Sequence, residues 1–270
     1  FWDEYPPYKK LSDDQKREFF RHRGASQLSQ FLHGEQGALL VASQLVSCAP
    51  TYQAKLYAAS QAFDEARHVE AFSRYIQTRS KLMYPVGTGL KSLLDKILTD
   101  ERWDLKLIGM QIIIEGLALA AFNTAKAVTP DPVFRDILHL IIRDEARHVT
   151  FGVNYLEDFI ENLTDGERED RAMFAYEACV ISKERLFPTD VFRKFGWNED
   201  EAREFSNNAG FALEFQRLLF SRVVPNLSRI GLLTDKVRPL YDKLGVLEFE
   251  SHTAEDITWA ELEKPLDLTA

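Results

Sequence analysis

The chain has 270 residues, of which 45% are hydrophobic and 28% charged, with 13 glycines, 10 prolines and 2 cysteines. These proportions exclude a disordered, collagen-like or disulfide-dense protein and are typical of a globular chain with a sizeable core. The 42 acidic and 33 basic residues give a formal net charge of -9, and no run of lysine and arginine interrupts this acidity. We therefore do not expect nucleic acid as a partner.

The cysteine usage indicates a reducing compartment, because Cys48 and Cys179 form neither a disulfide framework nor a CxxC motif. The polar, proline-bearing first ten residues lack the apolar segment of a signal peptide, so a cytoplasmic protein is expected. One apolar run, residues 107–122, is shorter than the ~20 residues that cross a bilayer. This run also contains Gln111 and Glu115, which favours a buried core helix and no membrane span.

Apolar residues recur at three- and four-residue spacing, and no alternating period-2 stretch is visible, so helices are expected throughout the chain. Turns around Pro50 and Pro130 divide the first part of the chain into two pairs of helices. Because each connection is short, each pair is expected to form an antiparallel hairpin. The four long helices are predicted at about 27–47, 52–79, 102–128 and 132–162.

The hairpins are joined by a crossover at residues 80–100, which includes a short amphipathic piece at 90–98. Fully extended, it would reach about 66 Å, more than the ~40 Å length of the helices it crosses. No segment has linker composition, so residues 1–270 are predicted to form a single domain. The expected fold is all-α: a four-helix bundle core at 27–162, then additional helices and an acidic tail at 163–270.

Those additional helices complete the predicted element order. They are expected at about 165–186, 198–220 and 225–244, and the acidic tail follows them. The turn at Trp197-Asn198 has the composition of a helix start, because asparagine is a favoured N-cap residue. No chemistry is predicted for this part of the chain.

A sequence repeat relates the two hairpins. The motif DEARHV occurs at 64–69 and again at 144–149, with an offset of 80 residues. The same offset pairs Glu35 with Glu115. Each hairpin therefore contains one glutamate and, thirty residues later, the motif Glu-Ala-Arg-His.

This spacing predicts that the repeated side chains meet inside the bundle. In each hairpin the two glutamates lie about fourteen residues on either side of the proline turn, so they stand at the same height on neighbouring helices. Each glutamate of the motif also shares a helix face with the histidine three residues later. Six side chains are expected to converge: Glu35, Glu65, His68, Glu115, Glu145 and His148.

Four buried carboxylates require positive charge, because burying each without compensation costs several kcal/mol. Two divalent cations would balance four glutamates, and a mixed oxygen and imidazole donor set suits iron or manganese. We therefore predict a dinuclear metal site. A glutamate from each of two helices plus Glu-x-x-His from each of two others is the donor set of ferritin-like di-iron and di-manganese bundles.

On these motifs, residues 27–162 resemble the ferritin-like di-metal carboxylate superfamily, especially its dioxygen-activating branch. That branch includes the ribonucleotide reductase small subunit and di-iron oxygenases. The resemblance implies that the six residues are both the metal ligands and the catalytic residues. It also implies that Glu35 and His68 are the terminal ligands of one metal and that Glu115 and His148 are the terminal ligands of the other. Glu65 and Glu145 would be able to bridge the two metals.

The resemblance also extends to residues beside the ligands. Asp64 and Asp144 match aspartates that orient the histidine contributed by the opposite helix, and Arg67 and Arg147 match the neighbouring arginines. Hydrogen bonds of this kind fix the imidazole tautomer.

Several departures from subfamily patterns narrow the expected activity. Phe72 stands where a radical-forming reductase subunit has tyrosine, and Ile141 stands where arylamine N-oxygenases have an additional histidine. Leu119 replaces the hydroxyl residue of methane-monooxygenase-like enzymes. The cysteine pairs of a rubrerythrin are missing from the sequence. None of these four specialised chemistries is therefore expected.

The function implied by the resemblance is a non-haem oxidase or oxygenase with two Fe ions, or a Mn/Fe pair. Dioxygen would be its co-substrate, and it would oxidise, hydroxylate or desaturate a small, partly apolar organic substrate. An external electron donor, ferredoxin or a reductase, and a homodimer are implied as partners. Two alternatives stay open: a ferroxidase or iron-storage protein, which native particle mass would distinguish, and a metal-free helical scaffold, which metal analysis would distinguish.

Overall fold

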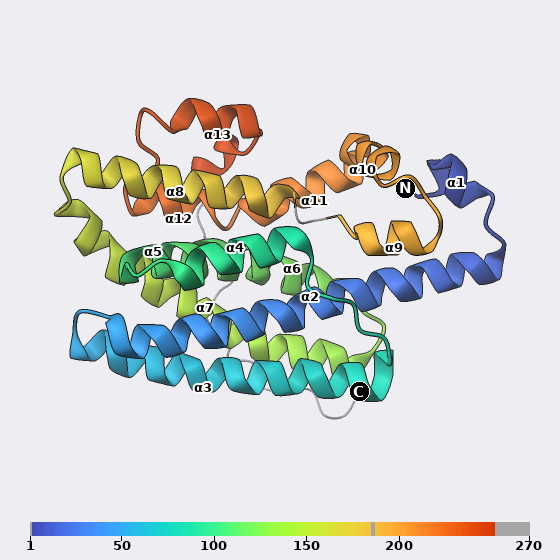
Figure 1. The fold of residues 1–270 in the computed structure, drawn as a ribbon, viewed down its shortest axis with the longest axis horizontal. Coiled ribbons are helices and arrows are strands. Elements are labelled where there is room, and N and C mark those ends of the chain that lie inside the picture. The colour runs from blue at the N-terminus through green and yellow to red at the C-terminus, as the bar shows by residue number, and fades with distance from the viewer. Residues whose placement is uncertain (1, 185–186, 252–270) are drawn as a thin grey trace.

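The computed structural model describes residues 2–184 and 187–251, and within these residues the chain is helical and contains no strand. Its centre is a bundle of two long helical hairpins (Figure 1). This architecture confirms the predicted all-α fold. Short elements precede and follow the long helices: η1 Trp2–Glu4, α1 Pro6–Lys9 and η4 Leu247–Ser251.

The first hairpin consists of α2 (Asp13–Cys48) and α3 (Tyr52–Tyr75). Helix α2 begins well before the predicted start near residue 27, so that boundary was wrong. The reason is a capping box: the Ser12 hydroxyl accepts a hydrogen bond from the Gln15 backbone N–H, and the Gln15 side chain accepts one from the Ser12 N–H. A single π-helical turn, Ile76–Ser80, follows α3.

The second hairpin begins with a continuous helix in three parts: α5 (Trp103–Leu107), the π-helical segment η3 (Ile108–Ile114) and α6 (Glu115–Val128). It is the one helix, among the described residues, that is long and apolar enough to cross a membrane, but 94% of its most apolar window is buried inside the protein. It is therefore a core helix of this fold, as the sequence predicts. Helix α7 (Pro132–Glu161) completes the hairpin.

The crossover between the hairpins carries α4 (Thr88–Thr99), which packs against α2 and α8. Its amphipathic pattern explains this position, because Leu93 and Ile97 are fully buried while Lys91 and Asp95 face solvent. The long connection predicted between the hairpins is therefore present and contributes to the core.

The C-terminal helices cover one side of the bundle (Figure 1). Helices α8, α11 and α12 contact η3, α6 and α7 respectively. Two predicted helices, 198–220 and 225–244, are each broken, because Ala209 has extended backbone and Gly231 has a positive φ of 75°. The elements are α8 Asp165–Glu184, α9 Thr189–Lys194, α10 Glu199–Asn208, α11 Gly210–Phe220, α12 Val224–Arg229 and α13 Arg238–Leu244.

One apolar cluster includes residues of both hairpins, α4 and the C-terminal helices, from Leu28 to Val246. A second, aromatic cluster holds the N-terminal segment against α9, with Trp2, Phe19 and Phe192 among its members. The boundary at residue 163 and the single domain stay predictions. The acidic tail beyond residue 251 lies outside the described residues.

Candidate metal centre

Every helix of the bundle contributes to one buried cluster at mid-height. Helix α2 supplies Glu35, α6 supplies Glu115, and α3 and α7 each supply the glutamate and histidine of the repeated motif. No member of the cluster is more than 5% exposed. The structure thus brings together all six predicted residues: Glu35, Glu65, His68, Glu115, Glu145 and His148.

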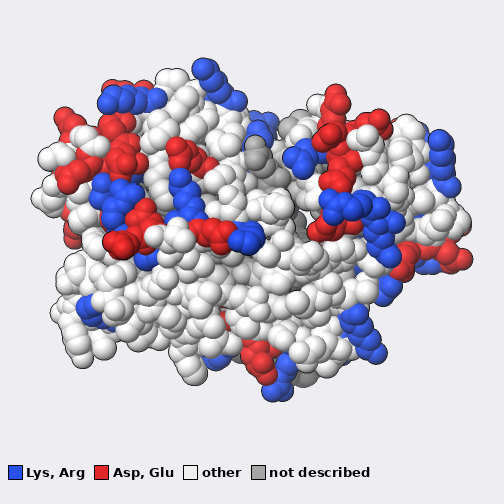
Figure 2. Space-filling model, in the orientation of Figure 1, with Lys and Arg blue, Asp and Glu red and all other residues white. Residues whose placement is uncertain are grey.

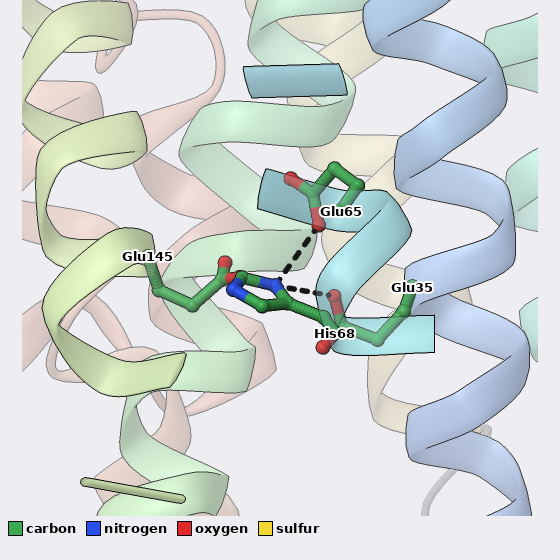
Figure 3. A group of neighbouring side chains, drawn as sticks. All are labelled: Glu35, Glu65, His68 and Glu145. Atoms are coloured by element: carbon green, nitrogen blue, oxygen red, sulfur yellow. Dashed lines mark hydrogen bonds and ion pairs between the residues drawn. The ribbon is translucent and has the colours of Figure 1, made fainter. Parts of the chain in front are cut away.

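The six side chains divide into two groups whose possible ligand atoms lie within 4.8 Å of one another. The first group is Glu35, Glu65, His68 and Glu145, and Figure 3 shows the imidazole of His68 between these carboxylates. The second group is Glu65, Glu115 and His148.

The carboxylate shared by the two groups is Glu65, whereas the sequence prediction gave a bridging position to both Glu65 and Glu145. The Glu145 Oε1 atom lies 3.2 Å from His68 Nδ1 but 3.9 Å from His148 Nδ1. Glu145 is therefore placed nearer the first group. This difference depends on side-chain rotamers, which sequence spacing does not determine.

Both imidazoles present Nδ1 to the cluster and Nε2 to an aspartate of the opposite helix. His68 Nε2 lies 3.1 Å from Asp144 Oδ2, and His148 Nε2 lies 3.3 Å from Asp64 Oδ2. Because each aspartate accepts the Nε2 proton, Nδ1 of each ring is left with a lone pair directed at the glutamates when the ring is neutral.

Two half-exposed arginines join these aspartates at the surface. Arg67 Nη2 donates to Asp64 Oδ1 at 2.5 Å and to Asp144 Oδ2 at 3.0 Å, and Arg147 Nη2 contacts the same two aspartates. Hydrogen bonding to His148 and Arg67 outweighs the effect of burial and lowers the pKa of Asp64 to about 2. The pKa of Asp144 is lowered in the same way, chiefly by His68. Both aspartates are therefore acceptors at neutral pH.

Burial has the opposite effect on three glutamates of the cluster. It raises the pKa of Glu35 and Glu115 well above the usual carboxyl range, and repulsion from Glu145 raises the pKa of Glu35 further. Burial and the nearby Glu65 also raise the pKa of Glu145. Without a cation, burial therefore favours the protonated, neutral form of these carboxyls.

The shared carboxylate Glu65 behaves differently. Burial alone would raise its pKa, but His148 and His68 outweigh burial and lower that pKa. Burial would lower the pKa of each histidine, but the surrounding carboxylates outweigh it and raise both pKa values. A cation would replace these protons, because metal ligands must be deprotonated.

Two buried glutamines belong to the same network, and the sequence reasoning missed their role. Gln61 Nε2 donates to Glu115 Oε1 at 2.6 Å and to Glu65 Oε1 at 3.2 Å, and Gln111 Nε2 donates to Gln61 Oε1 at 2.9 Å. Both were detectable in principle, because each lies four residues before a cluster glutamate and Gln111 interrupts an otherwise apolar run.

The two ends of the cluster have different walls. Phe31, Phe72 and Phe122 contact one another at one end, with ring centroids 4.8 to 5.9 Å apart. At the other end Gln61 lines a narrow cavity near the turn between α2 and α3. The remaining walls of this cavity are Leu45, Ala49, Ala54, Ala58, Leu107 and Phe151.

The donor atoms of the cluster fit a pair of metal ions. Among the described residues, four of these buried atoms make no hydrogen bond: Glu65 Oε2, Glu115 Oε2, Glu145 Oε1 and His148 Nδ1. The contacts of 3.2 Å that Glu65, Glu145 and His148 make are ion pairs within the cluster itself. Such atoms are costly unless something fills the space between them. Carboxylate oxygens with imidazole nitrogens suit iron or manganese, and each group has the three or more donors such an ion requires.

The chain matches no protein-family model and no curated protein sequence. Its fold is similar to a solved structure from Synechococcus, a protein described as having aldehyde deformylating oxidase activity. The TM-score is 0.62 at 17% sequence identity, over 83% of this chain and 97% of that one. The chain therefore has a ferritin-like helical bundle fold, with a buried carboxylate and histidine cluster suited to a di-metal centre.

Proposed function

We propose that this protein is a non-haem di-metal oxidoreductase that uses dioxygen to oxidise a small, partly apolar organic substrate. The observation that carries the proposal is the set of inward-facing buried donor atoms without hydrogen-bond partners. Four carboxylates and two imidazoles at one buried point do not stabilise a core by themselves, because the burial of ionisable groups opposes folding.

Two iron ions, or manganese and iron, are the proposed cofactor. Glu35, His68 and Glu145 would hold one ion, Glu115 and His148 the other, and Glu65 would contact both. When bound, the ions supply the electrons and the Lewis acidity for dioxygen chemistry.

The protein itself orients the donors and keeps water away. Asp144 and Asp64 accept the Nε2 protons, which fixes the tautomer and the ring orientation of His68 and His148. The helices exclude bulk water from the cluster, since all six proposed ligands are nearly fully buried. Removing water prevents side reactions of an oxidising site.

The proposed substrate class is an organic molecule with an apolar part, because the walls beside the cluster are aromatic and aliphatic. The activity described for the solved structure makes an aldehyde the first compound to test. Hydroxylation, desaturation and aldehyde oxidation each give a different product, which mass spectrometry of the reaction mixture distinguishes.

Partners complete the proposal. Turnover would need an external electron donor, a ferredoxin or a reductase, in the cytoplasm. We also propose a homodimer: over the C-terminal half of α2 and the N-terminal half of α3 the surface carries few charged side chains (Figure 2), and these helices expose Leu40, Leu56 and Phe63. A second copy of the same sparsely charged face can cover such residues symmetrically. Leu56→Glu should then halve the native mass measured by sedimentation, and an unchanged mass would contradict this interface.

The direct test of the function combines metal loading with turnover. After anaerobic loading with ferrous iron, the protein should contain two irons per chain. With a chemical reductant, it should consume dioxygen and convert an aldehyde or another apolar compound. Less than one iron per chain would indicate a metal-free scaffold. A hollow assembly of many subunits that oxidises only ferrous iron would indicate iron storage instead. Either result would overturn the proposal.

A further inference from the structure

The sequence repeat makes the two ends of the cluster comparable, position by position. The offset of 80 residues that relates Glu35 to Glu115 also relates Phe31 to Gln111. Phe31 and Gln111 each lie four residues before their glutamate, on α2 and on η3. An aromatic residue at one end of the cluster is thus replaced by an amide at the other.

The same comparison distinguishes α3 from α7. Gln61 lies four residues before Glu65, and the corresponding residue before Glu145 is Ile141. Ile141 is buried and apolar, whereas Gln61 is equally buried and hydrogen-bonded to two cluster glutamates. Glu65 therefore has an amide donor four residues earlier on its own helix, whereas Glu145 has an aliphatic side chain at the corresponding position.

A third difference makes room for the amides. Phe72 corresponds to Gly152 of α7. A Cβ atom at Gly152 would lie 2.6 Å from Gln111 Cβ, which is closer than real Cβ contacts. At the other end of the cluster, the space that corresponds to the Phe72 ring is therefore occupied by the side chain of Gln111. Gln111 approaches the backbone of α7 so closely that position 152 has room only for glycine.

The hydrogen bonds fix the orientation of the Gln61 amide. Because Gln111 Nε2 donates to Gln61 Oε1, the Gln61 amino group must face the carboxylates of Glu65 and Glu115. That amino group donates to the Oε1 atom of each glutamate, and the same two oxygens lie 3.2 and 3.9 Å from His148 Nδ1. The amide thus holds the carboxylate oxygens that face His148.

From this geometry we infer that Gln61, held by Gln111, is a positioning residue that makes the two cation positions unequal. The inference rests on the proposed di-metal function. The position formed by Glu65, Glu115 and His148 depends on the Gln61 hydrogen bonds and has fewer protein donors, so it is the weaker one. The position at Glu35 and His68 has four donor groups, of which only the shared Glu65 contacts Gln61.

The test is an anaerobic titration of the apo protein with Mn²⁺ alone, in which free ion is counted by electron paramagnetic resonance. The wild-type chain should bind two ions in two steps of different affinity. Gln61→Met should weaken the second step about 10 to 100-fold, as loss of an orienting hydrogen bond does, and change the first step less than about threefold. Ile141→Met is the matched control at the related position and should change neither step.

Two further variants guard against a folding defect. In the double variant Gln61→Met with Gln111→Met both amides are replaced by apolar side chains of similar shape, so no buried amide is left without its amide partner. Gly152→Ala displaces Gln111 without altering any proposed ligand. Both should selectively weaken the second step, while circular dichroism shows unchanged helix content.

A combination of variants identifies the affected position. Adding His148→Ala to Gln61→Met should abolish the weakened second step and leave the first step unchanged, because both residues act on one position, whereas adding His68→Ala should abolish the first step. Equal weakening of both steps by Gln61→Met, or no weakening, would overturn the inference while leaving the di-metal proposal intact. A wild-type protein that binds no Mn²⁺ and no Fe²⁺ would overturn the proposed function itself.

Discussion

Replacing Asp144 by alanine isolates the part that an orienting aspartate plays in the proposed metal centre. Asp144 Oδ2 lies 3.1 Å from His68 Nε2, and it also accepts a hydrogen bond from Arg67. Losing the first contact should weaken cation binding at the Glu35 and His68 position about 10 to 100-fold, which corresponds to about 1.4 to 2.7 kcal/mol. The lost arginine contact adds little, because Arg67 is half exposed.

The assay is equilibrium binding of Fe²⁺ or Mn²⁺ to the apo variant under anaerobic conditions, with urea unfolding measured in parallel. The apo protein should also lose about 1 to 3 kcal/mol of stability, because the buried His68 Nε2 is left without its acceptor. Asp95→Ala is the control, since Asp95 forms an exposed ion pair with Lys91 far from the cluster. Wild-type affinity in Asp144→Ala, or an equal loss in the control, would show that Asp144 does not orient His68 for cation binding.

Three further predictions address the site, a titration and the core. His148→Ala should reduce iron content from two to one per chain and abolish dioxygen consumption during turnover; full iron occupancy by elemental analysis would contradict its role. Tyr75 should titrate at about 12, because burial and the hydrogen bond to Asp131 raise its pKa. Since the folded state then holds this proton more tightly than the unfolded chain, the contribution of Tyr75 to stability is complete below pH ~10 and is lost as the pH rises through about 12. The difference between the wild-type and Tyr75→Phe absorption spectra at high pH measures this titration. A titration midpoint near pH 10 would contradict the prediction. Phe122→Ala should lower the free energy of unfolding by about 3 to 5 kcal/mol, because the ring is buried among aromatic neighbours. In the same urea experiment Phe20→Ala, at a half-exposed ring, should cost far less.

The convergence of the cluster could be predicted because it depends on spacing alone. Helical periodicity places Glu65 and His68 on one face, and equal distances from the proline turns place the glutamates of a hairpin at one height. The 80-residue offset then places the second hairpin in the same way. These relations hold for any antiparallel pair, so no knowledge of tertiary contacts was needed.

Helix boundaries could be predicted only where the sequence has a strong local start or stop signal and where that signal was taken into account. The capping box at Ser12 and Gln15 was present in the sequence, but the weak apolar pattern of the following charged residues concealed the start of α2. The break at Ala209 carries no proline, but Asn207, Asn208 and Gly210 beside it are poor helix formers. This local signal was not used, because the apolar periodicity continues across the break.

The glutamine network and the unequal sharing of carboxylates could not be predicted from spacing. The contact between Gln61 and Gln111 joins α3 to η3, so it requires the relative height of helices from different hairpins. The preference for Glu65 over Glu145 as the shared carboxylate depends on side-chain torsions. Both features follow from tertiary contacts that the sequence specifies only through the completed fold.

The most direct measurement is a crystal structure of the iron-loaded protein, with anomalous scattering recorded at the iron absorption edge. Two anomalous peaks per chain are expected. One should lie among Glu35, Glu65, His68 and Glu145, and the other among Glu65, Glu115 and His148. Peaks elsewhere in the molecule, or a fully loaded crystal without a peak in this cluster, would contradict the di-metal centre.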